Sequence, residues 1–277
     1  MIKEKFIKLK RMREGALIAY ITGGDPNLKL TPLIADSLIN GGVDILEVGI
    51  PFSDPIADGP TIQSAVERAL NAGATPKKIL DLIGKIKKRH EDTPIVILTY
   101  YNIIYRLGLK KFFKLASLSG VNGVITADLP IEEAEKYRRE AQKHYIDTIF
   151  LAAPSTPIER LRVIAQSSSG FLYLISTFGV TGVREKIQDL TIKFIEKALS
   201  AVDGEIPLAV GFGISKPEHV KKILSLGVDG VIVGSKFVKL IEERAEEKLL
   251  EKMKKLAFEL KKASKIGVFK VNRNGVE

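Results

Sequence analysis

Short apolar runs alternate with longer amphipathic segments along almost the whole chain. The runs are rich in valine, isoleucine and leucine, which is typical of parallel strands covered on both faces. Helix-length segments such as 30–42 and 131–144 lie between them. The pattern predicts eight strands, at 16–24, 44–50, 94–100, 123–129, 147–153, 170–176, 207–213 and 230–236.

Eight strands that each lead into a helix predict a (β/α)8 TIM barrel, in the α/β class. A doubly wound sheet is the alternative, but it usually has fewer strands, and no G-x-G-x-x-G motif follows the first run. No linker divides the chain, so we expect one domain over residues 1–277. We expect a last helix at about 237–265 and a frayed tail from about 266.

Composition narrows the class of protein. The chain has a net charge of +10, but its lysines alternate with glutamates in helical segments, which favours solvated helix faces over a nucleic-acid site. It has no cysteine, which excludes disulfides and thiolate metal sites and fits a reducing, cytoplasmic location. We expect no signal peptide and no membrane span, because the longest apolar run, PIVILTYYNIIY, is too short and too polar.

A carboxylate interrupts the second apolar run, DILEVGI. Side chains alternate along a strand, so Leu46 and Val48 should face the helices while Glu47 points into the barrel near its mouth. A carboxylate buried there either has a cationic partner or has a raised pKa, as a general acid or base at neutral pH requires. An ion pair inside the barrel is the alternative, but lysine and arginine are nearly absent from the other runs.

Two connections are longer than a simple turn, at 51–62 and 177–188. Such loops at the carboxyl ends of barrel strands often carry catalytic groups. Asp58 lies in the first loop, which is long enough to fold back over the same mouth. Its alternative role is that of a turn residue before a helix that begins at Gly59-Pro60.

Glycines follow the last two runs, in GFGISKPEHV and VGSKFV. Loops at these two positions of barrels often bind phosphate, because glycines let backbone amides approach an anion at a helix N-terminus. Tight turns alone are the alternative explanation. We also expect Ser215 and Glu218 to form a capping box. The three histidines lack ligand spacing, so we predict no metal site.

Several stretches of the sequence also resemble a known protein family. LEVGIPFSDPIADGPTIQ closely resembles the signature of the tryptophan synthase alpha subunit, and so do REGALIAYITGGDP, TADLP, YLISTFGVTG and GFGISKPEHV. The resemblance runs from about Arg13 to the last helix. It implies a lyase that cleaves indole-3-glycerol phosphate to indole and glyceraldehyde 3-phosphate by retro-aldol chemistry.

The resemblance also implies roles for individual residues. Glu47 matches the acid/base, Asp58 the carboxylate that holds the indole N–H, and Tyr173 a tyrosine beside the catalytic glutamate. Thr181 matches a lid residue. The phosphate cradle is matched by Gly182, Phe212, Gly213, Gly234 and Ser235. The indole pocket is matched by Tyr20, Thr22, Leu98, Tyr100 and Ile125.

The family implies a partner as well. The alpha chain needs no cofactor, whereas the beta subunit carries pyridoxal phosphate and receives indole through a tunnel in an alpha-beta-beta-alpha assembly. Two alternatives stay open at this point. One is another phosphate-binding barrel, such as an indole-glycerol phosphate synthase or a sugar-phosphate isomerase. The other is a non-catalytic chain that activates a beta-like partner.

Overall fold

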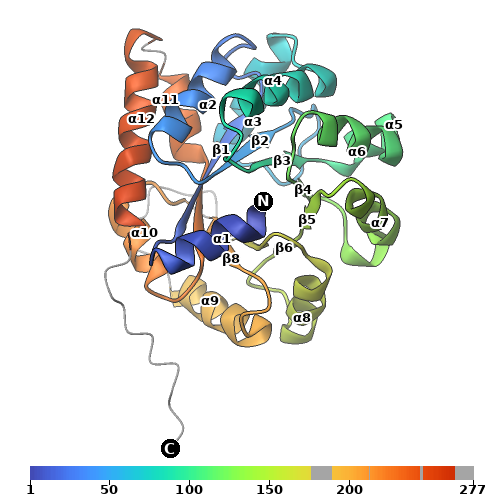
Figure 1. The fold of residues 1–277 in the computed structure, drawn as a ribbon, viewed down its shortest axis with the longest axis vertical. Helices are drawn as coiled ribbons and strands as arrows, with labels where there is room; N and C mark the ends of the chain where they lie inside the picture. Colours follow the sequence, from blue (N-terminus) through green and yellow to red (C-terminus); the bar gives the residue numbers. More distant parts are fainter. Residues whose placement is uncertain (176–188, 212, 244–245, 266–277) are drawn as a thin grey trace, which may run out of the picture.

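Parallel strands form a ring that helices surround in the computed structural model, which describes residues 1–175, 189–211, 213–243 and 246–265 (Figure 1). The sheet has the order β5-β4-β3-β2-β1-β9-β8-β7-β6. The strands are β1 (Ala16–Thr22), β2 (Ile45–Gly49), β3 (Ile95–Thr99), β4 (Gly123–Thr126), β5 (Asp147–Ile149), β6 (Leu151–Ala152), β7 (Leu172–Ile175), β8 (Leu208–Gly211) and β9 (Gly230–Val233).

The ring closes through the fifth predicted strand, which is divided into β5 and β6 at Phe150. β5 pairs with β4 and β6 pairs with β7, and the Tyr173 amide donates a 3.1 Å hydrogen bond to the Phe150 carbonyl across the division. The predicted barrel and its eight strand positions are therefore confirmed.

Helices pack around this ring. They are α1 (Ile2–Arg11), α2 (Leu30–Asn40), α3 (Pro60–Asn71), α4 (Pro76–Arg89), α5 (Tyr101–Leu107), α6 (Leu109–Leu118), η1 (Ile131–Glu133), α7 (Glu135–Lys143), α8 (Ile158–Ser167), α9 (Asp189–Val202), α10 (Pro217–Leu224), α11 (Ser235–Glu242) and α12 (Glu246–Ala263).

The prediction of a single long helix at about 237–265 is wrong, because α11 and α12 are separate helices. No glycine or proline marks the break. The two helices pack on different neighbours: α11 lies against α3 and β1, and α12 lies against α2 and α10. Tertiary packing therefore overrides helix propensity here. The tail expected from residue 266 lies outside the described residues.

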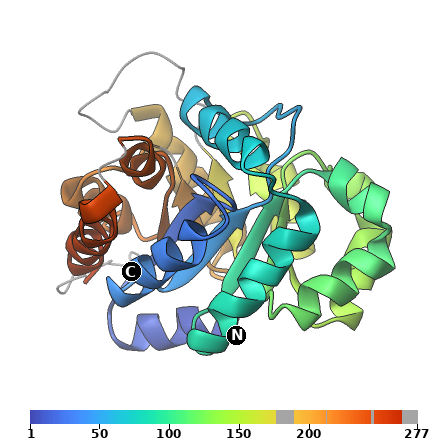
Figure 2. The same ribbon diagram turned by 90° about the horizontal axis from the view of Figure 1, so that it is seen from above.

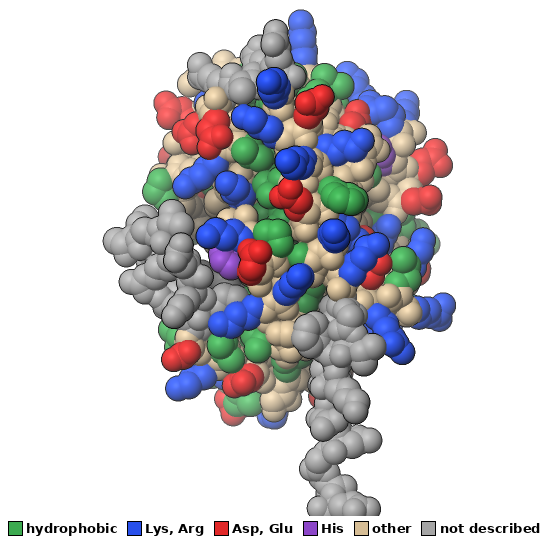
Figure 3. All heavy atoms as spheres, turned by 90° about the vertical axis from the view of Figure 1, so that its left-hand side faces the viewer, with side chains coloured by type: hydrophobic (Ala, Val, Ile, Leu, Met, Phe, Trp, Pro, Cys, Tyr) green, Lys and Arg blue, Asp and Glu red, His purple; other side chains and the backbone are tan. Residues whose placement is uncertain are grey.

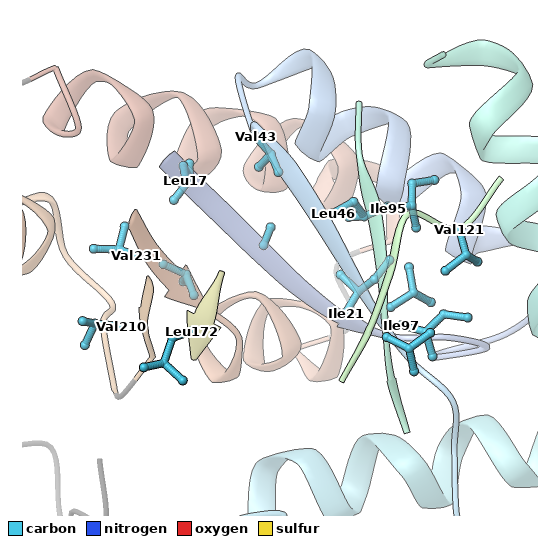
Figure 4. Close-up of a cluster of buried hydrophobic side chains, with 14 of the residues drawn as sticks. Leu17, Ile21, Val43, Leu46, Ile95, Ile97, Val121, Leu172, Val210 and Val231 are labelled. Atoms are coloured by element: carbon cyan, nitrogen blue, oxygen red, sulfur yellow. The ribbon is translucent and has the colours of Figure 1, made fainter. Parts of the chain in front are cut away.

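Two apolar layers result from the alternation of side chains along the strands. Outward residues such as Leu17, Leu46 and Val210 pack against the helices (Figure 4). Inward residues such as Ile18 and Ile45 fill the barrel.

The amino end of the barrel is closed by α1, which contributes Ile2, Phe6 and Leu9 to the inner cluster. The rings of Phe6 and Phe171 lie 5.9 Å apart. Figure 2 shows α1 at one end of the barrel, opposite the loop and helix that follow β2. Because α1 blocks the amino end, a small molecule can approach the inward-facing polar groups only from the carboxyl end.

Charged side chains of both signs are interspersed on the face that Figure 3 shows, without a continuous basic stripe. This agrees with the solvated helix faces expected from the sequence. In the described part of the chain, none of the helices is long and apolar enough to cross a membrane.

A charge cluster fastens the C-terminal helix to the amino end of the barrel. The Lys261 ammonium lies 2.8 Å from Asp44 Oδ2 and 2.9 Å from Glu14 Oε2, and the Leu17 amide donates to the same Asp44 oxygen. These side chains are only 10–13% exposed. Burial raises the pKa of Asp44 in spite of the nearby ammonium group.

Replacement of Lys261 by methionine should lower the free energy of unfolding by about 2–3 kcal/mol at neutral pH, because the largely buried Asp44 loses its ion-pair partner and Glu14 keeps only Lys265, 3.7 Å away. Urea titration measures this change, with Lys262→Met on the exposed face of α12 as the control. The loss should shrink as the pH falls and the Asp44 carboxyl takes up a proton. Equal unfolding free energies for the two variants would contradict the assigned role.

Candidate active site

Glu47 occupies the centre of the barrel mouth. It lies on β2 opposite Tyr20 of β1 and Val96 of β3, and its side chain is 1% exposed. Its neighbours in sequence, Leu46 and Val48, belong to the outer core, so the predicted inward direction of Glu47 is confirmed.

The surroundings of Glu47 leave its carboxyl group poorly solvated. Its Oε2 atom has no hydrogen-bond partner among the described residues, and burial raises the pKa of the carboxyl to about 8. No cation within the described ranges forms an ion pair with it. The ion-pair alternative is therefore not supported, and Glu47 carries a proton at neutral pH.

Tyr20 lies beside Glu47 over the end of β2. Its hydroxyl is 3.1 Å from Thr22 Oγ1, and a Cβ atom at Gly49 would come within 2.4 Å of that hydroxyl. Burial raises the pKa of Tyr20, and the charges of Asp58 and Glu47 add to the effect. The charges of both predicted catalytic carboxylates therefore raise the pKa of the same phenol.

Tyr173 is brought to the same place from β7. Burial and the charge of Glu47 raise the pKa of its phenol, so this side chain stays neutral. A Cβ atom at Gly211 would come within 2.7 Å of the Tyr173 ring. Gly49 and Gly211, which sequence analysis did not select as site residues, thus make room for the two tyrosines. Their signal in the sequence is a glycine inside a strand, which often marks a close approach.

Asp58 lies in the loop after β2 and is only partly buried. Burial raises the pKa of its carboxyl, while a hydrogen bond from the Tyr100 hydroxyl opposes that rise. The Ala57 amide donates to the same hydroxyl at 3.2 Å, and the ring of Phe52 lies 5.2 Å from that of Tyr100. The loop therefore folds back over the mouth, as predicted, and α3 begins at Pro60 after Gly59.

An apolar wall adjoins these polar groups. Tyr20 packs with Ala65 of α3 and Val238 of α11, and Ile62 and Leu98 border the cluster. Leu98 pairs with Ile125 on the neighbouring strand, and Thr22 is fully buried. Ala65, Ile62 and Val238 were not predicted, because they lie on helices whose packing against β1 has no local signal.

The glycines at the other side of the mouth follow β8 and β9, which are paired strands. Gly213 has a φ of +46°, and a Cβ atom there would meet nothing within 4 Å. Gly234 is the N-cap of α11, and Ser235 is its first residue. Thr181, Gly182 and Phe212 lie outside the described residues.

The predicted capping box at α10 is wrong. The N-cap is Lys216, with Pro217 as the first helical residue, and it makes no side-chain cap. The helix begins one residue later than a Ser215 cap would require, so Glu218 is no longer at the third position. Instead, the Ser215 amide donates to His219 Nδ1 at 3.4 Å.

Neither a metal centre nor the hollow elsewhere on the surface competes with this site. The described residues hold no cluster of three or more His, Asp or Glu side chains arranged to bind a metal. A hollow of about 540 Å³ lies between α6 and α7, and most of the side chains that line it are basic, such as Lys110 and Lys136. It contains none of the predicted site residues, and the buried carboxylate Glu47 lies at the barrel mouth.

Comparison with known proteins gives a consistent result. The family model described as tryptophan synthase alpha chain matches residues 6–265. The tryptophan synthase alpha chain of Methanosarcina barkeri is 45% identical over 264 residues, which cover 95% of this chain and 97% of the relative. That of Methanocaldococcus jannaschii is 46% identical over 246 residues, covering 89% and 86%.

Solved structures agree with the sequence relatives. A tryptophan synthase alpha chain from Legionella pneumophila is 35% identical, with a TM-score of 0.85 and coverage of 95% of this chain and 96% of that one. A chain from the tryptophan synthase α2β2 complex of Pyrococcus furiosus is 43% identical, with a TM-score of 0.84 and coverage of 90% and 98%.

Proposed function

Because the chain belongs to the tryptophan synthase alpha chain family, we propose that its barrel mouth cleaves indole-3-glycerol phosphate into indole and glyceraldehyde 3-phosphate. The reaction makes it a carbon–carbon lyase of tryptophan biosynthesis. One observation carries the assignment of the chemistry to this mouth: Glu47 is buried without a cationic partner among the described residues, and burial raises its pKa to about 8. Such a group both gives and takes a proton near neutral pH.

Glu47 performs both proton transfers of the cleavage. It first delivers its proton to indole C3, which makes the ring an electron acceptor with positive charge at its N–H. The resulting carboxylate then removes the proton of the glycerol hydroxyl next to the ring. The carbonyl of glyceraldehyde 3-phosphate forms, the carbon–carbon bond breaks, and its electron pair restores neutral indole. Glu47 ends protonated again, so the step needs no further reactant.

Asp58 has the complementary role because its surroundings differ. It is less buried than Glu47, and the Tyr100 hydroxyl donates to it, which favours its ionised form. An anion beside the indole N–H stabilises the positive charge that forms when C3 is protonated. Two carboxylates in different surroundings thus divide the acid/base and electrostatic roles.

The rest of the mouth fits the two ends of the substrate. Tyr20, Leu98 and Ile125 supply apolar contacts for the indole ring. We assign the phosphate to Gly213, Gly234 and Ser235, where backbone amides at the N-terminus of α11 attract an anion. Gly182 and Phe212, expected in the same cradle, and the lid residue Thr181 remain predictions.

We further propose that the chain works with a tryptophan synthase beta subunit, in an alpha-beta-beta-alpha assembly. Ile56 in the loop after β2 is 81% exposed, and Tyr105 on α5 is 72% exposed. These large apolar side chains follow neighbouring strands and suit a partner surface beside the mouth. In this assembly the alpha chain has no cofactor of its own and the beta subunit holds pyridoxal phosphate. The absence of cysteine fits a cytoplasmic enzyme.

Another phosphate-binding barrel is less consistent with the site. An indole-glycerol phosphate synthase would be expected to place a catalytic lysine at a strand end, and none of the described strands contains lysine. The non-catalytic activator remains as an outcome of the test below.

Indole release from indole-3-glycerol phosphate by the purified chain tests the proposal, with and without a beta subunit from the same source. We expect slow release by the chain alone and faster release with the partner. Release only with the partner would mean that the site assembles in the complex. No release in either case would refute the lyase assignment and leave the activator.

A further inference from the structure

Arg68 joins the parts of the barrel that hold the two ends of the substrate. It lies on α3, where Nε donates to Asp25 Oδ1 at 2.7 Å and Nη2 donates to Asp25 Oδ2 at 2.9 Å. Asp25 follows β1 and is 1% exposed. A bidentate arginine–carboxylate pair fixes both distance and orientation, which a single contact does not.

The anchor is connected to the site through β1. The Asp25 amide donates to the Thr22 carbonyl at 3.1 Å, and Thr22 Oγ1 lies 3.1 Å from the Tyr20 hydroxyl. The Gly23 amide donates to the Gly49 carbonyl of β2 at 2.8 Å. Arg68 therefore fastens α3 to the segment that positions Tyr20 beside Glu47.

Arg68 also faces the helix assigned to the phosphate. Its Nη1 atom lies 3.6 Å from Glu242 Oε1 at the end of α11. Ala65 of α3 and Val238 of α11 both pack on Tyr20, one turn before Arg68 and Glu242. The Glu242 carboxylate is half exposed, so this contact is the weaker of the two.

We infer that Arg68 is a positioning residue. It sets the spacing between the indole end of the site, which precedes α3 in the chain, and the phosphate end, where α11 begins. The inference rests on the proposed function. Asp58 lies shortly before α3, and Gly234 and Ser235 begin α11. A substrate that spans both ends depends on their spacing, whereas a ligand that occupies one end does not.

Arg68→Met should lower kcat/KM for indole-3-glycerol phosphate by about tenfold to a hundredfold, since small misplacements of a site are amplified in catalysis. The Kd values of indole and of inorganic phosphate, each titrated alone, should change by less than about twofold. Arg89→Met is the matched control, because Arg89 also donates twice to an aspartate, Asp36, and joins α4 to α2 outside the mouth. It should keep wild-type kcat/KM.

Arg68→Lys keeps the charge but not the bidentate geometry, so its kcat/KM should lie between those of the wild type and Arg68→Met. This variant decides the case if Arg68→Met does not fold. Wild-type kcat/KM in a folded Arg68 variant would overturn the inference. A loss accompanied by equally weakened binding of indole and phosphate would also overturn it, because it would indicate general damage. Failure of the wild type to release indole would instead refute the proposed function.

Discussion

Replacement of Glu47 by glutamine is expected to reduce indole release by about 10⁴-fold or more, since one group carries both proton transfers. Glutamine has nearly the same shape as the protonated carboxyl group that this buried site favours at neutral pH. The fold and the binding of substrate should therefore persist. The measurement is single-turnover indole release, together with the Kd for the substrate.

Glu140→Gln is the matched control for this change. Glu140 on α7 is also buried, but it is paired with Lys143 at 2.8 Å. The hydrogen bond from Lys143 lowers the pKa of the Glu140 carboxyl, whereas burial raises that of Glu47. That variant should release indole at the wild-type rate. A Glu47→Gln enzyme that retained near wild-type release would refute the assignment of the acid/base.

The raised pKa of Glu47 predicts two further effects of pH, one on the activity of the wild type and one on stability. The protonated form begins the reaction, so kcat/KM of the wild type should fall above about pH 8. The folded protein favours the protonated form of the Glu47 carboxyl. The stability that this preference gives the fold is fully present below the ordinary pKa of a glutamate, and it is lost as the pH rises through the pKa of Glu47 in the folded protein. Relative to the wild type, Glu47→Gln should therefore gain stability between about pH 4.5 and pH 8.

Glu47 illustrates what can be predicted from sequence. Its burial and its inward direction follow from local rules, because alternation along a strand needs no knowledge of distant segments. That neither neighbouring strand, β1 nor β3, supplies a cation to Glu47 was also foreseeable, since both runs lack lysine and arginine in the sequence. The barrel itself follows from the repeated strand–helix pattern. Local periodicity therefore predicted the architecture and the central carboxylate.

Contacts between distant segments were not predictable in the same way. Arg68 and Asp25 are separated by 43 positions, and only the packing of α3 on the end of β1 brings them together. Gly49 is needed because the register of β1 and β2 places the Tyr20 ring over it. The break between α11 and α12 likewise depends on what each helix packs against. These features depend on three-dimensional packing and register, for which a single sequence carries weak signals.

Replacement of Asp58 by asparagine should lower kcat/KM by about 10²–10³-fold, equivalent to about 3–4 kcal/mol of transition-state stabilisation. Asparagine still accepts a hydrogen bond from the indole N–H, but it has no charge to stabilise the cation that forms at C3 protonation. The ground state contains no such cation, so KM should change less than kcat. Steady-state kinetics of the purified chain separate the two parameters.

Asp54→Asn provides the control within the same loop. Asp54 is exposed and accepts a 2.5 Å hydrogen bond from Ser53, so in the chain assayed alone its loss should leave cleavage unchanged. Equal losses in the two variants would mean that the loop acts through its conformation. A loss confined to Asp58→Asn, and mainly in kcat, would mean that negative charge at this one position lowers the barrier. An unchanged kcat/KM in Asp58→Asn would leave Glu47 as the only carboxylate that the cleavage requires.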